Sequence, residues 1–313
     1  MRKINLSDLN ITSYEDHLDA SIHHFSAFDH VSGQIGHGSD PENSLAFKKA
    51  VNELVERIHF HQIAKAGGSR TSSGFAAHDD STSASESAIN ECVERDVFLM
   101  TWIARHPPCW LKQNSGEPNL DIFLNNTNEV FNKNGFTISF GVTGRSNGRT
   151  AVVGILRPHP HGPYRFGVVF SAAASPSLLS GLNSIYLELR RAANMVINRS
   201  AQRNMIYESI ESSMVSTTKD HLEYYLNPDN CKNLNWYFTD TDMTIEFPDI
   251  QYECIEISLN VIPPWPMKLA YASSLNAQSF FVGPTHDFNI NKNRIFSSFE
   301  PDTKLNFGLH PLP

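Results

Sequence analysis

A six-residue pattern that occurs twice constrains the fold of this chain more than any other feature. Asn52–Arg57 has the sequence N-E-L-V-E-R and Asn90–Arg95 has the sequence N-E-C-V-E-R, 38 residues further along. Each copy lies in a segment whose apolar residues recur at helical spacing, which predicts helices from Asn43 to about His61 and from about Ser83 to Ala104. Two related helices of this kind can face each other across one site.

Acidic side chains share one face of each predicted helix. Glu53 and Glu56 are three residues apart on the first helix, and Ser87, Glu91 and Glu94 follow one another at steps of four and three on the second. Converging carboxylates repel one another unless cations neutralise them. Hard oxygen ligands favour Mg²⁺, which proteins often hold together with substrate phosphates. The pattern therefore indicates a magnesium site.

The arginines that end the two copies have two interpretations. Beside Mg²⁺ and a nucleotide, Arg57 and Arg95 are placed to bind phosphate oxygens in a fork. Alternatively, Glu53–Arg57 and Glu91–Arg95 are ordinary surface ion pairs at i and i+4, with little effect on stability. The apolar residues around these charges favour the first interpretation, because a charged side chain beside a core face needs a partner.

The rest of the chain alternates between helical and strand-like patterns. We expect further helices at about 120–132 and 178–197, and strands at about 136–142, 150–156, 166–171 and 253–262. A hairpin is expected around Ser146–Gly148. The segment 202–247 is weakly patterned and partly helical up to Tyr225, and the residues after Phe281 look largely irregular. Helices and antiparallel strands in this order favour an α+β fold over a regular βαβ fold.

Composition and charge narrow the class of protein. With 40% apolar and 19% charged residues, the chain is an ordinary globular protein, and its net charge of −8 repels nucleic acid and anionic lipid. No secretion signal or membrane-length apolar stretch is evident, so we expect a cytoplasmic protein that binds neither nucleic acid nor membranes. The four cysteines lack the spacing of a zinc site or a disulfide framework, and we expect reduced, mostly buried thiols.

Common catalytic and nucleotide-binding motifs are missing from the sequence. There is no G-x-x-x-x-G-K-[ST] loop, and Gly36-His37-Gly38 lacks the third glycine and the preceding strand of a dinucleotide fingerprint. The sequence also has no G-x-S-x-G elbow and no H-E-x-x-H helix, which disfavours hydrolases and metalloproteases. Any ATP site in this chain is therefore not a Walker loop.

Four blocks of residues, taken in order, resemble the YcaO family, and specifically the members that form azoline rings in ribosomal peptides, as in thiazole/oxazole-modified microcin synthetases. The blocks are Gly36-x-Gly38 with Ala50-x-x-Glu53-x-x-Glu56-Arg57; Ser72-Ser73-Gly74 with Ser87-x-x-x-Glu91-x-x-Glu94-Arg95-Asp96; Ala172–Pro176 before a helix that carries Glu188; and the proline-rich end Asn306–Pro313. Together they span most of the chain.

The resemblance implies a YcaO-like mixed fold in which paired E-x-x-E-R helices line a non-Walker ATP site. It implies one compact domain over 1–313, made of the paired helices in 36–104, the hairpin and third helix in 118–200, and a C-terminal part in 201–313. The implied site residues are Mg²⁺ ligands Glu53, Glu56, Glu91, Glu94 and Glu188; ATP-binding residues Arg57, Ser73, Ser87 and Arg95; and the catalytic carboxylate of Pro313.

The resemblance also implies a reaction and partners. A Cys, Ser or Thr side chain of a precursor peptide attacks the preceding amide, ATP phosphorylates the amide oxygen, and phosphate leaves to give a thiazoline or oxazoline. The implied partners are the precursor peptide, an E1-like leader-binding protein and often a flavin-dependent azoline dehydrogenase. The alternatives are a YcaO-type enzyme that forms a thioamide or amidine, and a non-catalytic YcaO-like scaffold subunit.

Overall fold

The structure, a computed structural model, describes residues 2–65, 73–201, 210–259 and 261–312. It divides into two compact units, each described by itself. Unit 1 comprises Met1–Cys92 and Gln251–Leu275, and unit 2 comprises Val93–Ile250 and Asn276–Pro313. The prediction of a single domain stays a prediction, because one domain can contain two such units.

In unit 1 a long helix packs on two antiparallel sheets. This helix is α1 (Asn43–Lys65), and it contacts strands of both sheets. One sheet has the order β2-β3-β4 and the other β11-β13-β5. The strand bounds are β2 (Leu9–Tyr14), β3 (His23–Asp29), β4 (Gln34–Asp40), β5 (Phe75–His78), β11 (Glu253–Ile257) and β13 (Lys268–Ser273). The short strands β1 (Arg2–Lys3) and β12 (Val261–Ile262) pair in parallel, and η1 (Leu6–Asp8) is a single 3₁₀ turn.

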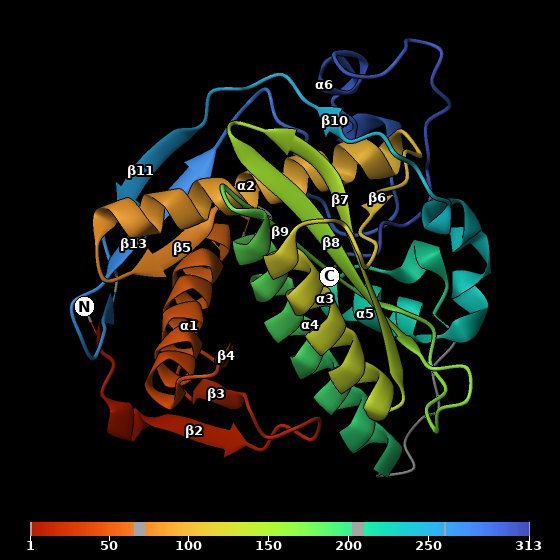
Figure 1. Ribbon diagram of the computed structural model, residues 1–313. Coiled ribbons are helices and arrows are strands. Elements are labelled where there is room, and N and C mark those ends of the chain that lie inside the picture. The colour runs from red at the N-terminus through yellow and green to blue at the C-terminus, as the bar shows by residue number, and fades with distance from the viewer. Residues whose placement is uncertain (1, 66–72, 202–209, 260, 313) are drawn as a thin grey trace. The chain divides into compact units, whose positions relative to one another are not determined.

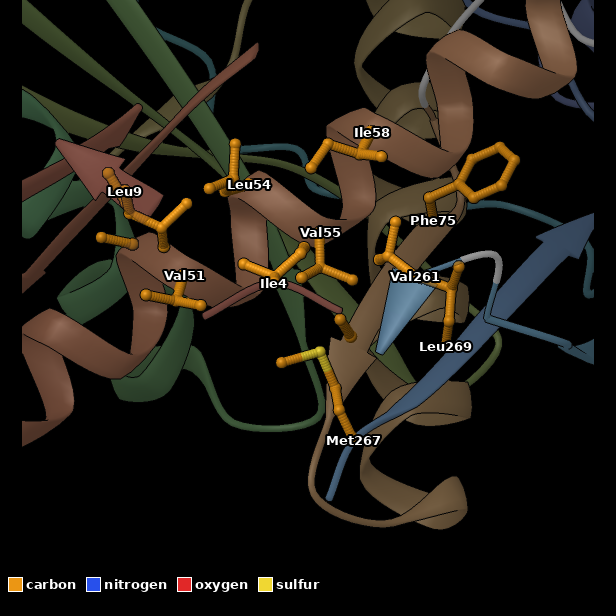
Figure 2. Packing of buried hydrophobic residues seen from close by; sticks show 13 residues of the cluster. Ile4, Leu9, Val51, Leu54, Val55, Ile58, Phe75, Val261, Met267 and Leu269 are labelled. Carbon is orange, nitrogen blue, oxygen red and sulfur yellow. The ribbon is translucent and has the colours of Figure 1, made fainter. Parts of the chain in front are cut away.

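The apolar face of α1 forms the core of unit 1. Val51, Leu54, Val55 and Ile58 recur at steps of three, one and three residues, and at most 2% of each is exposed. Figure 2 shows these side chains directed toward those of neighbouring strands, among them Leu269 of β13. The helical spacing that predicted α1 is therefore the spacing that this core requires.

Unit 2 is built on a sheet of order β10-β7-β8-β9, with β6 also paired to β7. Helix α4 packs on β8 and β9, and α3 packs on β7. The element bounds are β6 (Cys109–Trp110), α3 (Pro118–Lys133), β7 (Phe136–Ser146), β8 (Arg149–Pro158), β9 (Val169–Ser175), α4 (Leu178–Ala201) and β10 (Ile245–Glu246). Asn147 (φ 53°) and Gly148 (φ 65°) turn the β7–β8 hairpin, as the sequence predicted, since both residues adopt positive φ readily.

The helix with the second copy of the repeat passes from one unit into the other. This helix, α2, spans Ser81–Ile103, and the unit boundary falls between Cys92 and Val93. Both helices predicted around the repeats are confirmed to within a few residues. The other helical elements of unit 2 are η2 (Ser212–Met214), α5 (Thr218–Leu226), η3 (Pro228–Phe238), η4 (Asp287–Asn289) and α6 (Lys292–Phe296).

Two strand predictions need correction. The strand expected from Phe166 begins at Val169, because the N–H groups of Gly167 and Val168 donate to carbonyl oxygens at the end of α5 instead of to β8. The strand expected over 253–262 is two short strands, β11 and β12. β12 pairs with β1, near the start of the chain. In both cases the strand limits depend on segments far away in the sequence.

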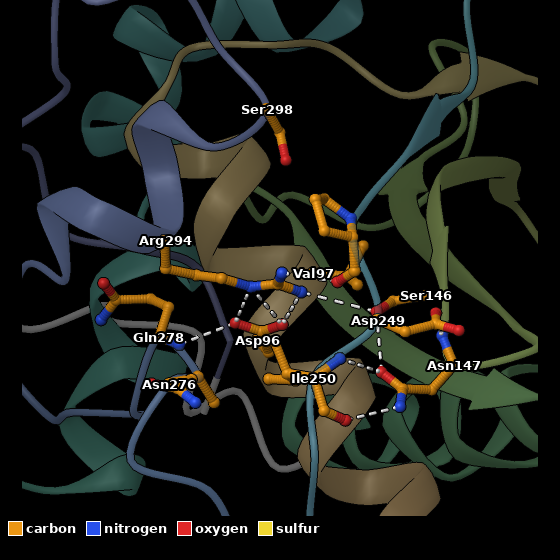
Figure 3. Close-up of polar contacts among 12 residues, drawn as sticks. Asp96, Val97, Ser146, Asn147, Asp249, Ile250, Asn276, Gln278, Arg294 and Ser298 are labelled. Atoms are coloured by element: carbon orange, nitrogen blue, oxygen red, sulfur yellow. Dashed lines mark hydrogen bonds and ion pairs between the residues drawn. The ribbon is translucent and has the colours of Figure 1, made fainter.

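A buried ion pair joins distant segments of unit 2, as Figure 3 shows. The Nη2 atom of Arg294 lies 2.7 Å from Oδ2 of Asp96, and the side chains are 3% and 0% exposed. The backbone N–H of Gln278 donates to Asp96 Oδ1 at 2.7 Å, and Arg294 Nη1 donates to the carbonyl oxygen of Pro248 at 2.7 Å. Burial raises the pKa of Asp96, whereas the guanidinium of Arg294 opposes that shift.

We predict that Asp96→Asn lowers the free energy of unfolding by about 3 kcal/mol, because it leaves the buried guanidinium of Arg294 without its counter-charge. Urea unfolding monitored by circular dichroism measures this change. The control is Glu246→Gln, which breaks the exposed Arg145–Glu246 pair of the same unit and should cost well under about 1 kcal/mol. Equal small losses in both variants would contradict a stabilising role for Asp96.

Candidate functional site

Three glutamates of the repeated motif bind backbone N–H groups within unit 1. On α1, Glu53 Oε2 accepts a hydrogen bond from the N–H of His37 in β4 at 2.6 Å. Glu56 Oε1 accepts one from the N–H of Ala77 in β5, also at 2.6 Å. On α2, Glu91 Oε2 accepts one from the N–H of Gly74, just before β5, at 3.1 Å. Backbone donors therefore fix the direction of all three carboxylates.

Glycines allow the strand backbone to come this close. A Cβ atom on Gly36 would lie 2.2 Å from the carbonyl oxygen of Ala50, and one on Gly38 would lie 2.0 Å from that of Ala46. β4 therefore lies against the backbone of α1, and this approach brings the intervening N–H of His37 to Glu53. The sequence showed the two glycines, but their role follows from the packing of a strand on a helix.

Gly74 likewise allows a close approach of backbone, in this case at Glu91 of α2. Its φ is +86°, a conformation that L side chains rarely adopt, and a Cβ there would lie 2.2 Å from the carbonyl oxygen of Ala272. Only glycine therefore fits the turn that directs this N–H at Glu91. The turn at Ser73–Gly74 thus binds a carboxylate in unit 1.

Burial and like charge act together on Glu56. Burial raises the pKa of this carboxyl group well above its ordinary value, and the carboxylates of Glu53 and Glu91 raise it further. The N–H of Ala77 and the guanidinium of Arg57 oppose the shift. Without a cation, the site therefore favours the protonated form of Glu56.

The ion-pair interpretation of Arg57 describes part of what the structure shows. Its Nε and Nη2 atoms donate to Glu53 Oε1 at 3.0 and 2.6 Å, which is the i, i+4 pair. The guanidinium side chain is 46% exposed, whereas the other oxygen of Glu53 is held by the backbone of β4. The pair therefore neutralises one glutamate and leaves the arginine accessible to a ligand.

The two predicted ATP-binding serines also belong to unit 1. Ser87 lies one turn before Glu91 on α2, and its Oγ is 3.0 Å from Nε2 of His78 at the end of β5. Burial lowers the pKa of His78, which favours the neutral imidazole. Ser73 is half-buried and directly precedes the turn at Gly74. Ser73 therefore adjoins the N–H that binds Glu91, and Ser87 contacts the residue that follows Ala77, whose N–H binds Glu56.

The remaining predicted site residues lie in unit 2 or outside the described residues. Arg95 Nε is 3.3 Å from Glu94 Oε1, and its guanidinium carbon is 4.7 Å from the ring centre of Phe280. Glu188 is exposed on α4 and accepts a hydrogen bond of 2.5 Å from the buried Ser171 of β9. Pro313 lies outside the described residues.

The side chains of the acidic site are chemically suited to Mg²⁺, but they are not arranged as a metal site in this structure. Its donors are hard carboxylate oxygens, and the mutual repulsion at Glu56 is what a cation would relieve. Over the part of the chain that the structure describes, no three His, Cys, Asp or Glu side chains are already arranged to hold a metal ion. Holding Mg²⁺ would therefore require a rearrangement of these acidic side chains.

A family comparison agrees with this chemistry. Residues 58–252 match the family described as YcaO cyclodehydratase, ATP- and Mg²⁺-binding. Because the match covers more than half of the chain, the protein belongs to the YcaO family. This confirms the family and the cofactors, ATP and Mg²⁺, predicted from the sequence. The match begins at Ile58, just after the first copy of the repeat.

Solved structures share the fold at low sequence identity. A chain of the E. coli microcin synthetase McbBCD complex with pro-MccB17 bound is 12% identical, with a TM-score of 0.67 and 99% of both chains covered. YcaO from Methanopyrus kandleri bound with AMPPCP and Mg²⁺ is 14% identical, with a TM-score of 0.61 and 95% and 90% coverage. A heterocyclase in complex with substrate and cofactor is 10% identical, with a TM-score of 0.62; the match covers 97% of this chain but 54% of that one.

These matches confirm the predicted α+β, YcaO-like fold. No curated protein gave a significant match. Among the helices of the described residues, none has both the length and the apolarity needed to cross a bilayer. The four cysteines, all among the described residues, form no disulfide, and each is half-buried.

We predict that Glu56→Gln stabilises the metal-free protein increasingly as the pH rises. Since the folded-state pKa of Glu56 is raised, wild-type stability is lost as the pH increases from the ordinary value of 4.5 through the raised pKa. Within that window the wild type loses about 1.4 kcal/mol per pH unit relative to the variant. Urea unfolding of both proteins in EDTA at several pH values measures the difference.

The matched control for this experiment is Glu86→Gln, an exposed position on α2. Its stability should follow that of the wild type across the same pH range. A difference between wild type and Glu56→Gln that does not change with pH would contradict the burial of an ionisable Glu56.

Proposed function

We propose that this protein is the ATP-dependent cyclodehydratase subunit of a peptide-modifying complex. It would convert Cys, Ser or Thr residues of a ribosomally made precursor peptide into thiazolines or oxazolines. The observation that carries the proposal is the set of three motif glutamates in unit 1, which are directed by backbone N–H groups and repel one another at the buried Glu56. The family to which the chain belongs is described as ATP- and Mg²⁺-binding, which supports a role for this acidic site in binding Mg²⁺.

The residues proposed to hold Mg²⁺ include Glu53, Glu56 and Glu91, whose carboxylates are already directed by the strands. The resemblance adds Glu94 and Glu188 as proposed ligands. Bound Mg²⁺ supplies positive charge that neutralises the phosphates of ATP. Because a ligand carboxylate must be ionised, cation binding should displace the proton that the raised pKa of Glu56 favours.

Four residues are proposed to bind the nucleotide itself. Arg57 is accessible and can exchange its bond to Glu53 for one to a phosphate oxygen. The hydroxyl groups of Ser73 and Ser87 are candidate donors to phosphate, and Arg95 supplies a further cation. These roles follow from the resemblance, and the positions of the two serines beside the carboxylate-binding turn and on α2 support them.

The proposed reaction removes water from the peptide at the expense of ATP. The thiol or hydroxyl of the peptide adds to the preceding amide carbon, and the resulting oxyanion takes the γ-phosphoryl group of ATP, which releases ADP. Phosphate then leaves with the former amide oxygen, the nitrogen loses its proton, and a C=N bond forms within the ring that the addition has already closed. We assign the transfer of the nucleophile's proton to the carboxylate of Pro313, as the resemblance implies.

Partner proteins are part of the proposal. The microcin synthetase chain with the same fold belongs to the McbBCD complex, which is described with pro-MccB17 bound. By analogy we propose that this chain acts on a precursor peptide delivered by an E1-like leader-binding subunit. A flavin-dependent dehydrogenase would then oxidise azolines to azoles. We propose that this assembly is cytoplasmic.

We predict that the chain, mixed with its partner proteins and a Cys/Ser/Thr-rich precursor, removes about 18 Da per ring and forms one ADP and one phosphate for each ring. Peptide mass spectrometry and a phosphate assay on the same reaction measure both quantities. A gain of about 16 Da instead would indicate thioamide formation by the same ATP site. Absence of ATP turnover in every combination would favour the scaffold alternative.

We predict that Glu91→Gln abolishes MgATP binding but leaves the fold intact. Glutamine retains an oxygen that accepts the Gly74 N–H bond, but it removes the negative charge that a cation needs. Titration calorimetry measures binding, and circular dichroism checks the fold. Glu86→Gln on the same helix is the control and should bind as the wild type does. Unchanged MgATP affinity in Glu91→Gln would remove the metal-site hypothesis.

A further inference from the structure

Side chains of unit 2 bind consecutive carbonyl groups of the tail segment, defined here as Asn306–Leu312. The donors are Thr285 Oγ1 to Gly308 at 2.9 Å, Tyr225 Oη to Leu309, and His221 Nδ1 to His310 at 2.9 Å. Leu309, His310 and Leu312 are at most 3% exposed. A segment without regular structure is thus held by side-chain donors in place of a sheet or helix.

Helix α5 supplies two of these donors from one face. His221 and Tyr225 are four residues apart, so their side chains lie one above the other along the helix. The start of α5 is fixed by a capping box, in which Thr217 accepts from the N–H of Asp220 at 3.1 Å and Asp220 accepts from the N–H of Thr217 at 2.8 Å. The helix therefore presents both donors in a fixed position.

The hydrogen bonds of His221 specify its protonation state. The N–H of Gly283 donates to Nε2 at 2.8 Å, so Nε2 carries no proton and Nδ1 is the donor to the carbonyl oxygen of His310. A second proton on His221 would place two donors against each other at Gly283. The neutral imidazole with its proton on Nδ1 is therefore the form that binds the tail.

His310 completes the contact from the tail side. Its ring centre lies 4.5 Å from that of His221, and its Nε2 donates to the carbonyl oxygen of Phe281 at 2.6 Å. Burial lowers the pKa of both histidines, the nearby charge of Arg95 lowers that of His310 further, and Asp220 opposes the shift at His221. The neutral imidazoles of His221 and His310, through buried hydrogen bonds, thus hold the tail segment against the rest of unit 2.

We propose that His221 and Tyr225 are positioning residues that hold the tail segment in one place for catalysis. The inference rests on the proposed function, since the resemblance assigns a proton transfer to Pro313, directly after this segment. Helix α5 acts through hydrogen bonds to the tail and not through contact with ATP or the peptide. Loss of a donor should therefore slow the chemical step and leave ATP binding unchanged.

The test uses Tyr225→Phe, which removes one hydroxyl group, and Tyr224→Phe, a half-buried neighbour on the same helix, as control. Hydrogen exchange by mass spectrometry should show amide exchange in residues 306–312 about tenfold faster in Tyr225→Phe. kcat for azoline formation should fall several-fold, with KM for ATP unchanged. Tyr224→Phe should match the wild type in both measurements.

A second pair of variants guards against general misfolding. Asparagine can place an amide N–H close to the position of Nδ1, so His221→Asn should keep near-native exchange of the tail and most of the activity. His221→Leu removes the donor at similar bulk and should behave like Tyr225→Phe or worse. Equal effects of His221→Asn and His221→Leu would overturn the assigned role of the Nδ1 donor.

The outcomes separate this inference from the function on which it rests. Unchanged exchange of residues 306–312 in Tyr225→Phe would overturn the positioning role. Faster exchange with an unchanged kcat would also overturn it, although cyclodehydration would stand. If the wild type forms no azoline, the proposed function and the catalytic positioning role both fail, while the exchange data still measure whether α5 holds the tail.

Discussion

Unit 1 depends on hydrogen bonds between helix carboxylates and strand N–H groups. A carboxyl group that leaves water needs hydrogen-bond partners, and β4 and β5 supply N–H donors to Glu53 and Glu56 of α1. The donor for Glu53 is within reach because Gly36 and Gly38 let the strand lie against the helix backbone. The core face of α1 and its acidic face therefore form together, and the same packing that buries Leu54 also positions the glutamates.

Elements set by local interactions were predicted well. The apolar spacing of α1 and α2 predicted both helices, and the turn at Asn147–Gly148 predicted the β7–β8 hairpin. The strands β2, β3, β4, β5 and β13 were not predicted, and the errors in the predicted strands concern limits that are set from elsewhere. β9 begins late because residues before it bond to α5, and the expected strand over 253–262 is divided because β12 pairs with β1. Neither partner is visible in the local pattern.

In the candidate site too, some features were predictable from the sequence and others depend on distant segments. The repeated motif predicted Glu53, Glu56 and Glu91 as Mg²⁺ ligands, which stays a prediction, and the family to which the chain belongs is described as ATP- and Mg²⁺-binding. The sequence did not show that Glu91 would bind the turn at Gly74, or that Glu56 would be the carboxylate with the raised pKa. Both depend on which backbone lies within a few ångströms of each carboxylate.

Unit 2 is held by pairs that are still further apart in the sequence. Asp96 and Arg294 are separated by 198 residues, and His221 and His310 by 89. By itself, the sequence determined the acidic motif, which resides in residue type and short spacing, and its resemblance to the YcaO family predicted the family and the cofactors ATP and Mg²⁺. Tertiary structure alone decided the backbone donors of the glutamates, the protonation of Glu56 and the neutral histidines at the tail. Burial and hydrogen bonding depend on distances across the fold, and spacing along the chain does not contain them.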